Sequence, residues 1–387
     1  MHSRCPRGRR LPYNDAPDAL SGADDSDNIA DPQRRGLLEV VERMTFLRNC
    51  WQVAAYGREV IAGRIMTRRI ANEPLILFRT ARGKLVAMED RCPHRSAPLS
   101  KGTLLGEQIR CGYHGLKYDS EGKCTHIPGQ SLIPPKARAR VYPIVERHTF
   151  AWIWMGDADK ADPASIPDVH WIDDKGWARS DGYHRIAASY RLLNDNLLDL
   201  SHETYVHVHT IGNEAVADTP VVVKSDDKAV YVVKEIDRCN PPPLYQYLGN
   251  VAPNAEVKRW QRTTYKPPGY CVIDVGIEAI GAIPGAVRVE GRVINLMTPE
   301  TESTSHYFWA FARNFRLDEP EVTEFLRENV RRTFDEDKDM LEAQQANLGD
   351  GDFDPAYKVA VKADAGAVAG RRLLNSFIEA EARAVAA

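Results

Sequence analysis

One stretch, residues 92–115, constrains what this chain can fold into more than any other. It reads CPHRSAPLSKGTLLGEQIRCGYHG and contains two short segments, C-P-H at 92–94 and C-G-Y-H at 111–114, with sixteen residues between His94 and Cys111. A [2Fe–2S] centre of mixed ligation needs two thiolates on one iron and two imidazoles on the other. Two loops that each supply one ligand to each iron satisfy that need. The predicted cluster ligands are Cys92, His94, Cys111 and His114.

A structural zinc site with two cysteines and two histidines is the main alternative for this stretch. Zinc sites usually take both cysteines from one knuckle, as C-x2-4-C, and often both histidines from another. Here each segment is mixed, as C-x-H and C-x2-H, which fits zinc poorly. Four unrelated residues are the third possibility, because free cysteine is often a small buried hydrophobe. The prolines and glycines around both segments argue against that, since ligand loops need turns.

Length and composition describe an ordinary globular chain. Its 387 residues suffice for two domains, and 43% are hydrophobic and 27% charged. The net charge of −3 provides no strong field for nucleic acid or an anionic membrane, and no apolar run approaches the ~20 residues of a membrane span. Seven cysteines at irregular spacing do not suggest a secreted disulfide framework. We therefore expect a cytoplasmic protein without nucleic-acid or membrane partners.

The first 170 residues fall into three segments. Residues 1–43 are acidic, rich in small residues and proline-bearing after a basic start, which predicts a disordered extension. Residues 44–156 contain short strand candidates separated by glycine turns, which predicts an all-β domain that carries both cluster loops. Residues 157–170 are polar and punctuated by proline, as a linker would be.

From residue 171 to 387 the pattern becomes α+β. A strand over 183–193 is expected to run into a helix over 194–207. Further strand candidates are 229–236, 270–279, 286–298 and 305–314. Helices are expected over 319–345 and 367–384. Strands followed by a long helix suggest a curved antiparallel sheet wrapped on a helix.

A second group of polar residues lies in the segment NDNLLDLSHETYVH, with Asn196, Asp199, His202 and His207. Two histidines near a carboxylate suggest the facial triad of non-haem Fe(II) oxygenases. His202 and His207 are five residues apart, about 140° around a regular helix. Both can bind one metal only if the helix ends or distorts between them. Such a pair alone is more often structural, but the cluster motif upstream favours a metal site.

The third ligand of such a triad is a carboxylate, which the helix expected over 319–345 can supply. The inward stripe of this helix, with i+3/i+4 spacing, consists of Leu326, Val330, Phe334 and Leu341. Position 337 falls on the stripe, whereas the acids at 335, 336 and 339 fall off it and are expected on a solvated face. An acid on an apolar stripe is costly unless it is paired or bound to a metal. Asp337 is therefore the predicted third ligand.

These motifs resemble those of the Rieske non-haem iron oxygenases. EDRCPHRSAPLS and CGYHGLKYDSEGKC resemble the cluster loops of that family, NLLDLSHETYVH its D-x2-H-x4-H iron motif, and FDEDKDMLEAQQ the segment with the third ligand. The likeness covers about residues 44–385 and looks closest to the vanillate O-demethylase branch, which also holds dicamba and toluenesulfonate monooxygenases. It implies an all-β Rieske domain followed by an α+β helix-grip-like catalytic domain, with iron on His202, His207 and Asp337.

The resemblance also implies partners and catalytic residues. Electrons would come from NADH through a separate ferredoxin or flavin reductase, and the chain itself has no G-x-G-x-x-G after a strand. Asp199 and Asn196 are the predicted catalytic residues. In the family, the aspartate equivalent to Asp199 does not bind iron. It bridges to a cluster histidine, here His114, of the adjacent subunit in a homotrimer.

The implied function is that of the terminal oxygenase of an aromatic O-demethylase. Hydroxylation of the methoxy carbon of a vanillate-like acid gives a hemiacetal, which collapses to a phenol, protocatechuate, and formaldehyde. An oxygenase acting on another aromatic substrate is the alternative, and a Rieske electron carrier without oxygenase activity is a third. One face of 305–314 holds Tyr307, Trp309 and Phe311 and is a candidate pocket wall. Arg259 and Arg313 are candidates to hold a substrate carboxylate.

Overall fold

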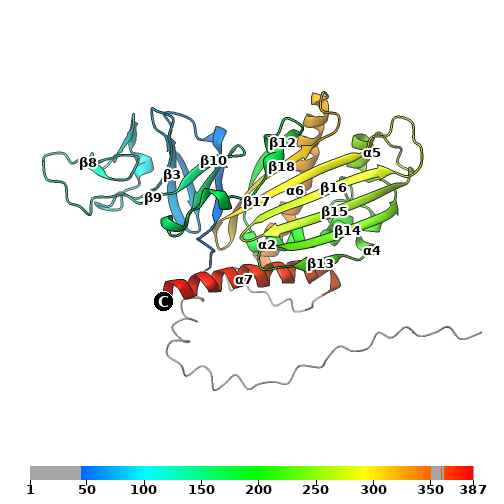
Figure 1. The fold of residues 1–387 in the computed structure, drawn as a ribbon. Coiled ribbons are helices and arrows are strands. Elements are labelled where there is room, and N and C mark those ends of the chain that lie inside the picture. The colour runs from blue at the N-terminus through cyan, green and yellow to red at the C-terminus, as the bar shows by residue number, and fades with distance from the viewer. Residues whose placement is uncertain (1–44, 350–358, 360, 387) are drawn as a thin grey trace, which may run out of the picture.

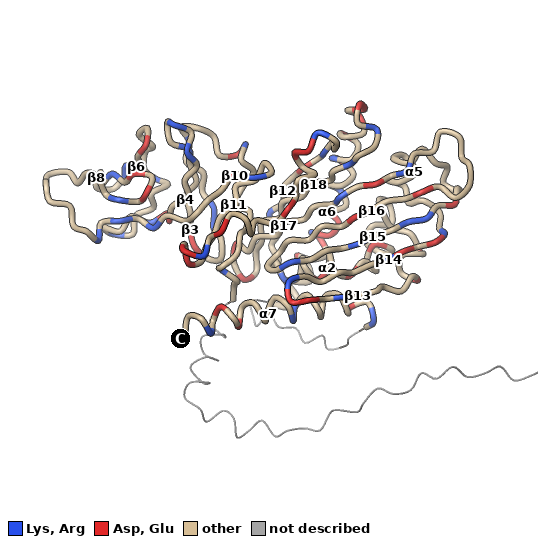
Figure 2. The backbone as a smooth tube through the Cα atoms, viewed as in Figure 1, with Lys and Arg blue, Asp and Glu red and all other residues tan. Residues whose placement is uncertain are grey.

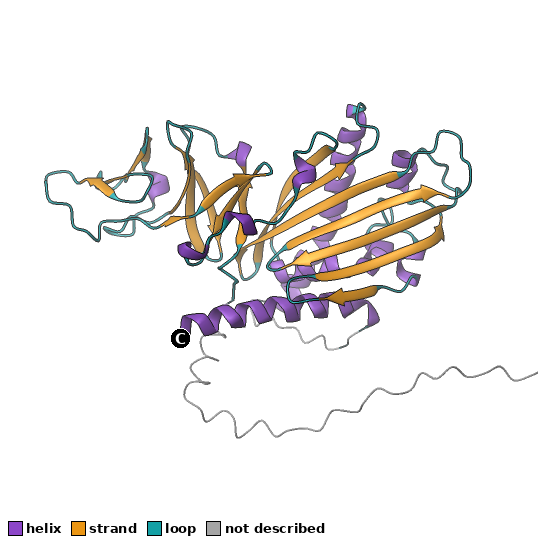
Figure 3. Ribbon diagram, in the orientation of Figure 1, coloured by secondary structure: helices purple, strands orange, loops and turns teal. Residues whose placement is uncertain are grey.

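The computed structural model describes residues 45–349, 359 and 361–386 (Figure 1). The extension expected over 1–43 lies outside the described residues. An N-terminal all-β part lies beside a larger α+β part built on one long sheet (Figure 3). The last strand of the first part, β11, ends at Trp154, and the first strand of the second part, β12, begins at Ala178.

The N-terminal part consists of three small antiparallel sheets. The first has the order β1 (Trp51–Tyr56), β11 (Phe150–Trp154) and β10 (Ile144–Arg147). The second has the order β2 (Met66–Ile70), β3 (Glu73–Arg79), β4 (Leu85–Glu89) and β9 (Val141–Tyr142). The third has the order β5 (Thr103–Leu105), β6 (Gln108–Arg110), β7 (Lys117–Tyr118) and β8 (Cys124–His126). Short 3-10 helices are η2 (Gly57–Glu59) and η3 (Leu99–Lys101). The third sheet lies at the tip of the molecule (Figure 1).

Strand β3 is apolar throughout because both of its faces are covered. Successive side chains of a strand point to opposite faces. Ile76 and Phe78 face a small core that includes Cys92 and Cys111, whereas Leu75 and Leu77 belong to the main core of the molecule. The tip with the cysteine–histidine segments is thus packed onto the rest of the chain through this strand.

The segment 157–170 is not a polar spacer. It contains the 3-10 helices η4 (Ala158–Lys160) and η5 (Pro163–Ser165), and η6 (His170–Ile172) begins at its end. Aspartates precede η4 and η5, and their side chains accept hydrogen bonds from backbone N–H groups of those helices. Ile166 and Val169 are buried in the core between the two parts. The linker expected from the polar composition is therefore a packed part of the interface.

The C-terminal part is organised by one antiparallel sheet in the order β12-β18-β17-β16-β15-β14-β13. Its strands are β12 (Ala178–Ile186), β13 (Val222–Ser225), β14 (Val230–Cys239), β15 (Val257–Lys266), β16 (Tyr270–Ala279), β17 (Val289–Thr301) and β18 (Thr304–Arg313). The helices are α2 (Tyr190–Leu198), η7 (Leu200–His202), α3 (Glu203–Val206), α4 (Glu214–Asp218), α5 (Pro243–Gly249), α6 (Pro320–Leu348), η8 (Lys362–Asp364) and α7 (Ala365–Ala386). Figure 1 shows α6 behind the sheet and α7 beneath it, beside β13. The expected sheet wrapped on a helix is confirmed.

The long helix α6 forms as its sequence predicts. Proline at the first turn fits there because its missing N–H would have no partner. The inward stripe Leu326, Val330, Phe334 and Leu341 is buried, and so is Asp337. Phe334 packs between Tyr307 and Trp309 of β18, with ring centroids 5.0 Å and 5.5 Å away.

Two sequence expectations were wrong in this part. The strand expected over 183–193 ends at Ile186, because Ser189 caps α2 with its side chain and starts a helix at Tyr190. Strand β15 was not predicted at all. Its inward positions include Arg259, Gln261 and Thr263, so it lacks the apolar alternation that identifies a half-buried strand.

The two parts share an apolar interface. Tyr56, Phe150 and Trp152 pack with Leu296 and Phe308 from the outer face of the long sheet. The Tyr56 hydroxyl lies 2.8 Å from the carbonyl of Trp309 and 3.0 Å from that of Gly182, and Thr298 donates to the carbonyl of Val53 at 2.8 Å. Hydrogen bonds to backbone in a dry interface fix the register of the two parts.

Charges of both signs are spread over both parts (Figure 2). None of the helices in residues 45–349 and 361–386 combines the length and the apolar character that crossing a membrane requires.

His306 lies in this interface and makes its stability depend on pH. Its side chain is 3% exposed. Nε2 lies 2.9 Å from the carbonyl of Arg69 and must carry the proton, so Nδ1 accepts from the hydroxyl of Tyr183 at 2.8 Å. Burial lowers the pKa of His306 from 6.5 to about 4. The folded state therefore holds this imidazole neutral.

We expect wild-type stability to fall as the pH drops from 6.5 to about 4, by roughly 3 kcal/mol from this residue. The sign follows because the unfolded state binds the proton in this window and the folded state does not. His306→Gln keeps a donor for the Arg69 carbonyl but does not titrate. Urea midpoints at several pH values should therefore fall less steeply for His306→Gln than for the wild type. Equal slopes would contradict this assignment.

Candidate functional site: two metal centres

Two loops at the tip of the N-terminal part follow the same backbone path. The N–H of Ser96 donates to the carbonyl of Cys92 at 2.8 Å, and the N–H of Gly115 donates to the carbonyl of Cys111 at 3.1 Å. In both loops the cysteine N–H donates at 2.8 Å to the carbonyl five residues later. Ser96 and Gly115 both have positive φ, 54° and 76°. Equivalent turns therefore present the two cysteine–histidine pairs.

The four predicted cluster ligands lie together with their sulfur atoms inward. Cys92 and Cys111 are buried, His94 is exposed and His114 is partly exposed. The two imidazole rings have centroids 4.6 Å apart. The hydroxyl of Tyr118 lies 3.1 Å from Sγ of Cys92, where it can donate to a thiolate. This donor set fits a [2Fe–2S] cluster whose thiolate side is buried and whose imidazole side faces solvent.

The second ligand set depends on a break after α2. The helix ends at Leu198, and Asp199 is extended, with φ −114° and ψ 98°. The carboxylate of Asp199 then accepts from the N–H of Ser201 at 2.9 Å and caps η7. His202 and His207 flank the four-residue helix α3 at its two ends. Their rings come within 5.1 Å, so the predicted helix distortion brings both histidines to one place.

Asp337 of α6 joins the two histidines. Its Oδ1 lies 3.4 Å from Nε2 of His202 and 3.2 Å from Nε2 of His207. The three ligand atoms lie within 4.8 Å of one another. Asn196 donates its Nδ2 to the same carboxylate oxygen at 3.0 Å and holds it in place. The set matches the two histidines and one carboxylate of non-haem iron sites.

The other nitrogen of each histidine is held by the protein. Nδ1 of His202 is hydrogen-bonded to the carbonyl of Asp199, and Nδ1 of His207 lies 2.9 Å from Glu336. Such partners place the proton on Nδ1 and leave the Nε2 lone pair free for a metal. The expected solvated face is thus wrong for Glu336. Asp335 also has a partner, Nε2 of His184 at 3.1 Å.

Protons and a metal compete for this site. Burial opposes the charged form of His202, but the Asp337 carboxylate outweighs it and raises the pKa of His202 to about 9. Burial likewise opposes ionisation of Asp337, yet the two histidines hold its pKa far below the ordinary value. Metal ligands must be deprotonated to bind, so a divalent cation replaces these protons.

An apolar cavity borders the second ligand set. It is lined by the three ligands and by side chains of the long sheet, α2, α5 and α6, with about 60 Å³ open inside. Phe311, from the face predicted to line a pocket, is part of its wall. Arg259 and Arg313 are not. Arg259 pairs with Glu203 at 2.8 Å, and Arg313 donates to the carbonyl of Glu319 at 3.0 Å, so neither is placed to hold a substrate carboxylate.

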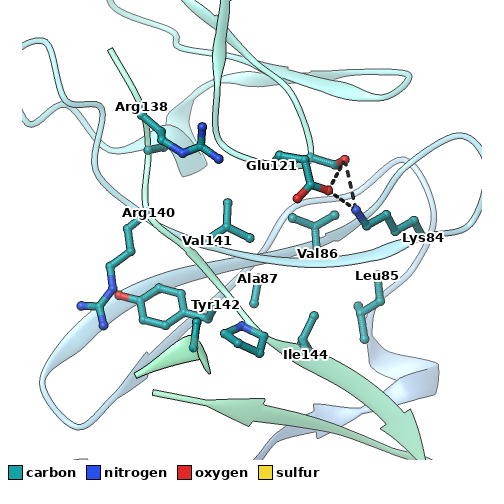
Figure 4. A pocket seen from close by; sticks show the side chains of 14 residues that line it. Lys84, Leu85, Val86, Ala87, Glu121, Arg138, Arg140, Val141, Tyr142 and Ile144 are labelled. Carbon is teal, nitrogen blue, oxygen red and sulfur yellow. Dashed lines mark hydrogen bonds and ion pairs between the residues drawn. The ribbon is translucent and has the colours of Figure 1, made fainter. Parts of the chain in front are cut away.

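Another hollow, of about 690 Å³, lies on the N-terminal part. Figure 4 shows its apolar floor with Val86 and Val141, its Lys84–Glu121 ion pair and the side chains of Arg138 and Arg140. None of the seven predicted ligands lines it.

Comparisons with known proteins agree with these two centres. A model of the Rieske [2Fe-2S] domain matches residues 50–139, and a model of the vanillate O-demethylase oxygenase C-terminal domain matches residues 186–380. Over 345 residues the chain is 39% identical to the toluene-4-sulfonate monooxygenase system iron-sulfur subunit TsaM1 of Comamonas testosteroni, covering 87% of this chain and 98% of that one. Over 346 residues it is 38% identical to the vanillate O-demethylase oxygenase subunit of Pseudomonas sp. (strain HR199 / DSM 7063), covering 88% and 97%.

A solved structure shows the same fold. Dicamba monooxygenase bound to 3,6-dichlorosalicylic acid superposes with a TM-score of 0.80 at 32% identity, covering 87% of this chain and 99% of that one. A chain with a Rieske domain, this sheet and this ligand triad defines a non-haem iron oxygenase.

The chain belongs to the Rieske oxygenase family, with a C-terminal domain of the vanillate O-demethylase type. It is an oxygenase component that uses a Rieske [2Fe–2S] cluster and a mononuclear iron at His202, His207 and Asp337. The alternative of an electron carrier without oxygenase activity is therefore wrong.

Proposed function

We propose that this protein is the terminal oxygenase of an aromatic O-demethylase that acts on methoxybenzoates of the vanillate type. The observation that carries the proposal is the apolar cavity with His202, His207 and Asp337 in its wall, which brings an aromatic ring beside the iron ligands. The 38% identity to a vanillate O-demethylase oxygenase subunit supports the choice of substrate.

In the proposed reaction, a methoxyarene, O2, NADH and a proton give a phenol, formaldehyde, water and NAD⁺. The cluster supplies electrons and the mononuclear iron activates O2 when both are bound. The proposal assigns the cluster to Cys92, His94, Cys111 and His114. A ferredoxin or flavin reductase is the proposed source of electrons from NADH.

The chain's own residues position the reactants. Phe311 and Phe334 offer flat apolar surface to an aromatic ring. Asn196 holds Oδ1 of Asp337, and Glu336 holds the ring of His207. The free space of about 60 Å³ is smaller than a benzoate, so substrate entry requires movement of side chains in the wall.

We further propose a homotrimer in which Asp199 connects the two centres across subunits. Within one chain the cluster loops lie at the tip of the N-terminal part, whereas the iron ligands lie on α3 and α6, under the long sheet (Figure 1). Asp199 is partly exposed, and its Oδ1 is engaged by Ser201. The proposed partner of its other oxygen is His114 of the partner subunit, with Asp199 and Asn196 as the residues that serve catalysis beside the ligands.

The proposed function predicts formaldehyde from methoxybenzoates. Purified protein is incubated with a reductase, NADH, O2 and a panel of methoxylated aromatic acids, and formaldehyde and phenolic products are measured. We expect release from vanillate, in a ratio of one formaldehyde per phenol formed. The panel includes toluene-4-sulfonate, because the 39% identity to TsaM1 makes oxidation of an aryl methyl group the second candidate. Oxidation of that compound without formaldehyde from any methoxybenzoate would favour the second candidate.

A further inference from the structure

The inward face of β15 is unusual for a strand in the middle of a sheet core. Arg259, Gln261 and Thr263 point inward and are each no more than 2% exposed. Flanking strands place Ile273 and Val275 on the same face. Buried polar groups are costly unless they are hydrogen-bonded. The partners of these three side chains therefore indicate what the face is built for.

Glu203 organises two of the three. Nη2 of Arg259 donates to Oε2 of Glu203 at 2.8 Å, and Nε2 of Gln261 donates to Oε1. An ionised carboxylate can only accept hydrogen bonds, so it forces the amide of Gln261 to turn its NH2 group toward Glu203. The carbonyl oxygen of Gln261 is thereby turned away from Glu203.

That carbonyl oxygen is left without a donor. Oε1 of Gln261 is buried and has no hydrogen-bond partner among the described residues, and Gln261 lines the cavity beside the iron ligands. Two other polar members of the wall have partners. Asn295 donates to the carbonyl of Cys271 at 3.1 Å and accepts from Tyr307, and Thr333 donates to the carbonyl of Asn329.

The charge of the cavity points the same way. No lysine or arginine is among the described residues that line it. The one carboxylate in its wall besides Asp337 is Glu203, whose two oxygens already accept hydrogen bonds. The polar group that such a cavity can recognise is therefore an uncharged donor rather than a carboxylate.

We propose that Gln261 determines substrate specificity by accepting a hydrogen bond from a hydroxyl group on the aromatic substrate. Glu203 and Arg259 are positioning residues that fix the orientation of its amide. The inference rests on the proposed demethylase function and deepens it, because it selects methoxybenzoates with a free phenol. A substrate without that hydroxyl would leave Oε1 of Gln261 buried and unpaired, which is costly.

The test compares substrates that differ only at the hydroxyl. Vanillate, 3-methoxybenzoate and 3,4-dimethoxybenzoate are assayed with the holoenzyme and its reductase, and kcat/KM is obtained from formaldehyde release. We expect the wild type to prefer vanillate by roughly 10- to 100-fold. Gln261→Met, which is similar in size but cannot accept this bond, should lower kcat/KM for vanillate by that factor and leave 3-methoxybenzoate nearly unchanged.

Thr263 provides a matched control. Its hydroxyl is also buried without a partner among the described residues, and it lies two residues along the same strand face, but it does not line the cavity. Thr263→Val should keep the wild-type preference for vanillate. If Gln261→Met does not fold, Gln261→Asn, which retracts the amide by one methylene, is measured in its place with the same expectation.

A binding measurement separates this inference from the reaction. The affinities of 4-hydroxybenzoate and benzoate for the holoprotein are measured by calorimetry. If 4-hydroxybenzoate binds more tightly and Gln261→Met removes the difference, the role of Gln261 stands even when no methoxybenzoate yields formaldehyde. Equal binding of the two ligands by the wild type would overturn it. So would a Gln261→Met variant that weakens both ligands equally, or a Thr263→Val variant that loses the preference.

Discussion

His202→Ala is expected to remove the mononuclear iron and abolish oxygenation while the Rieske spectrum persists. Nε2 of His202 is one of three ligand atoms that converge on the site, and alanine offers no replacement. The predicted cluster ligands lie on separate loops that share no residue with this site. Iron should fall from roughly three to roughly two atoms per subunit. Metal analysis and the visible spectrum of the same sample measure both centres.

His209→Ala is the matched control for that variant. His209 is exposed, stands two residues after His207, and is not part of the ligand set among the described residues. It should retain three irons and full activity, in agreement with the expectation that the iron motif ends at His207. Loss of both metals in His202→Ala would indicate misfolding, and retention of all three irons would show that His202 is not a ligand.

Asp199→Asn is expected to keep both metal centres and lower turnover on the order of 100-fold. The amide oxygen of asparagine can still accept from the N–H of Ser201, so the cap of η7 and the position of His202 should survive. What is lost is the negative charge and the second acceptor oxygen, which the proposed contact to His114 of the partner subunit requires. Metal content, the cluster spectrum and the rate of cluster oxidation after mixing with substrate and O2 are the measurements.

A mixing experiment distinguishes electron transfer across subunits from a purely structural role of Asp199. Subunits with Cys92→Ala lack the cluster, and subunits with His202→Ala lack the iron, so each should be inactive alone. Assembled together, they should regain part of the activity because an intact cluster can serve an intact iron in the next subunit. Mixed oligomers, verified by two affinity tags, that stay inactive would contradict the proposed path. If Asp199→Asn instead loses iron, Asp199 has a structural role.

The sequence predicts the ligands well where local spacing carries the information. Periodicity places Asp337 on the buried stripe of α6, and the helix is found where that stripe predicts it. The two-histidine motif requires a broken helix, and the break follows α2. These features depend on neighbours within a few residues, where the geometry of helices and turns restricts the possibilities.

Partners from distant segments could not be predicted in this way. Glu336 holds His207 although the two are 129 residues apart, and its position off the apolar stripe indicates solvent. Strand β15 was missed because its inward residues are polar, and the reason for that polarity lies in Glu203, which is 56 residues from Arg259. Sites of function break the alternation of apolar and polar residues, so the rule fails at the place where the chemistry is specified.

The apolar interface between the two parts has a consequence for how this chain can be divided. The main core runs without interruption from Leu47 and Ile153 of the N-terminal part to Tyr190 and Leu374 of the C-terminal part. Glu381 of α7 also accepts from the N–H groups of Arg48 and Asn49, at 3.1 Å and 3.0 Å. Truncation between the parts would expose Leu296 and Phe308 to water. The molecule should therefore melt in a single cooperative transition, and chimaeras with a relative would have to exchange both sides of this seam together.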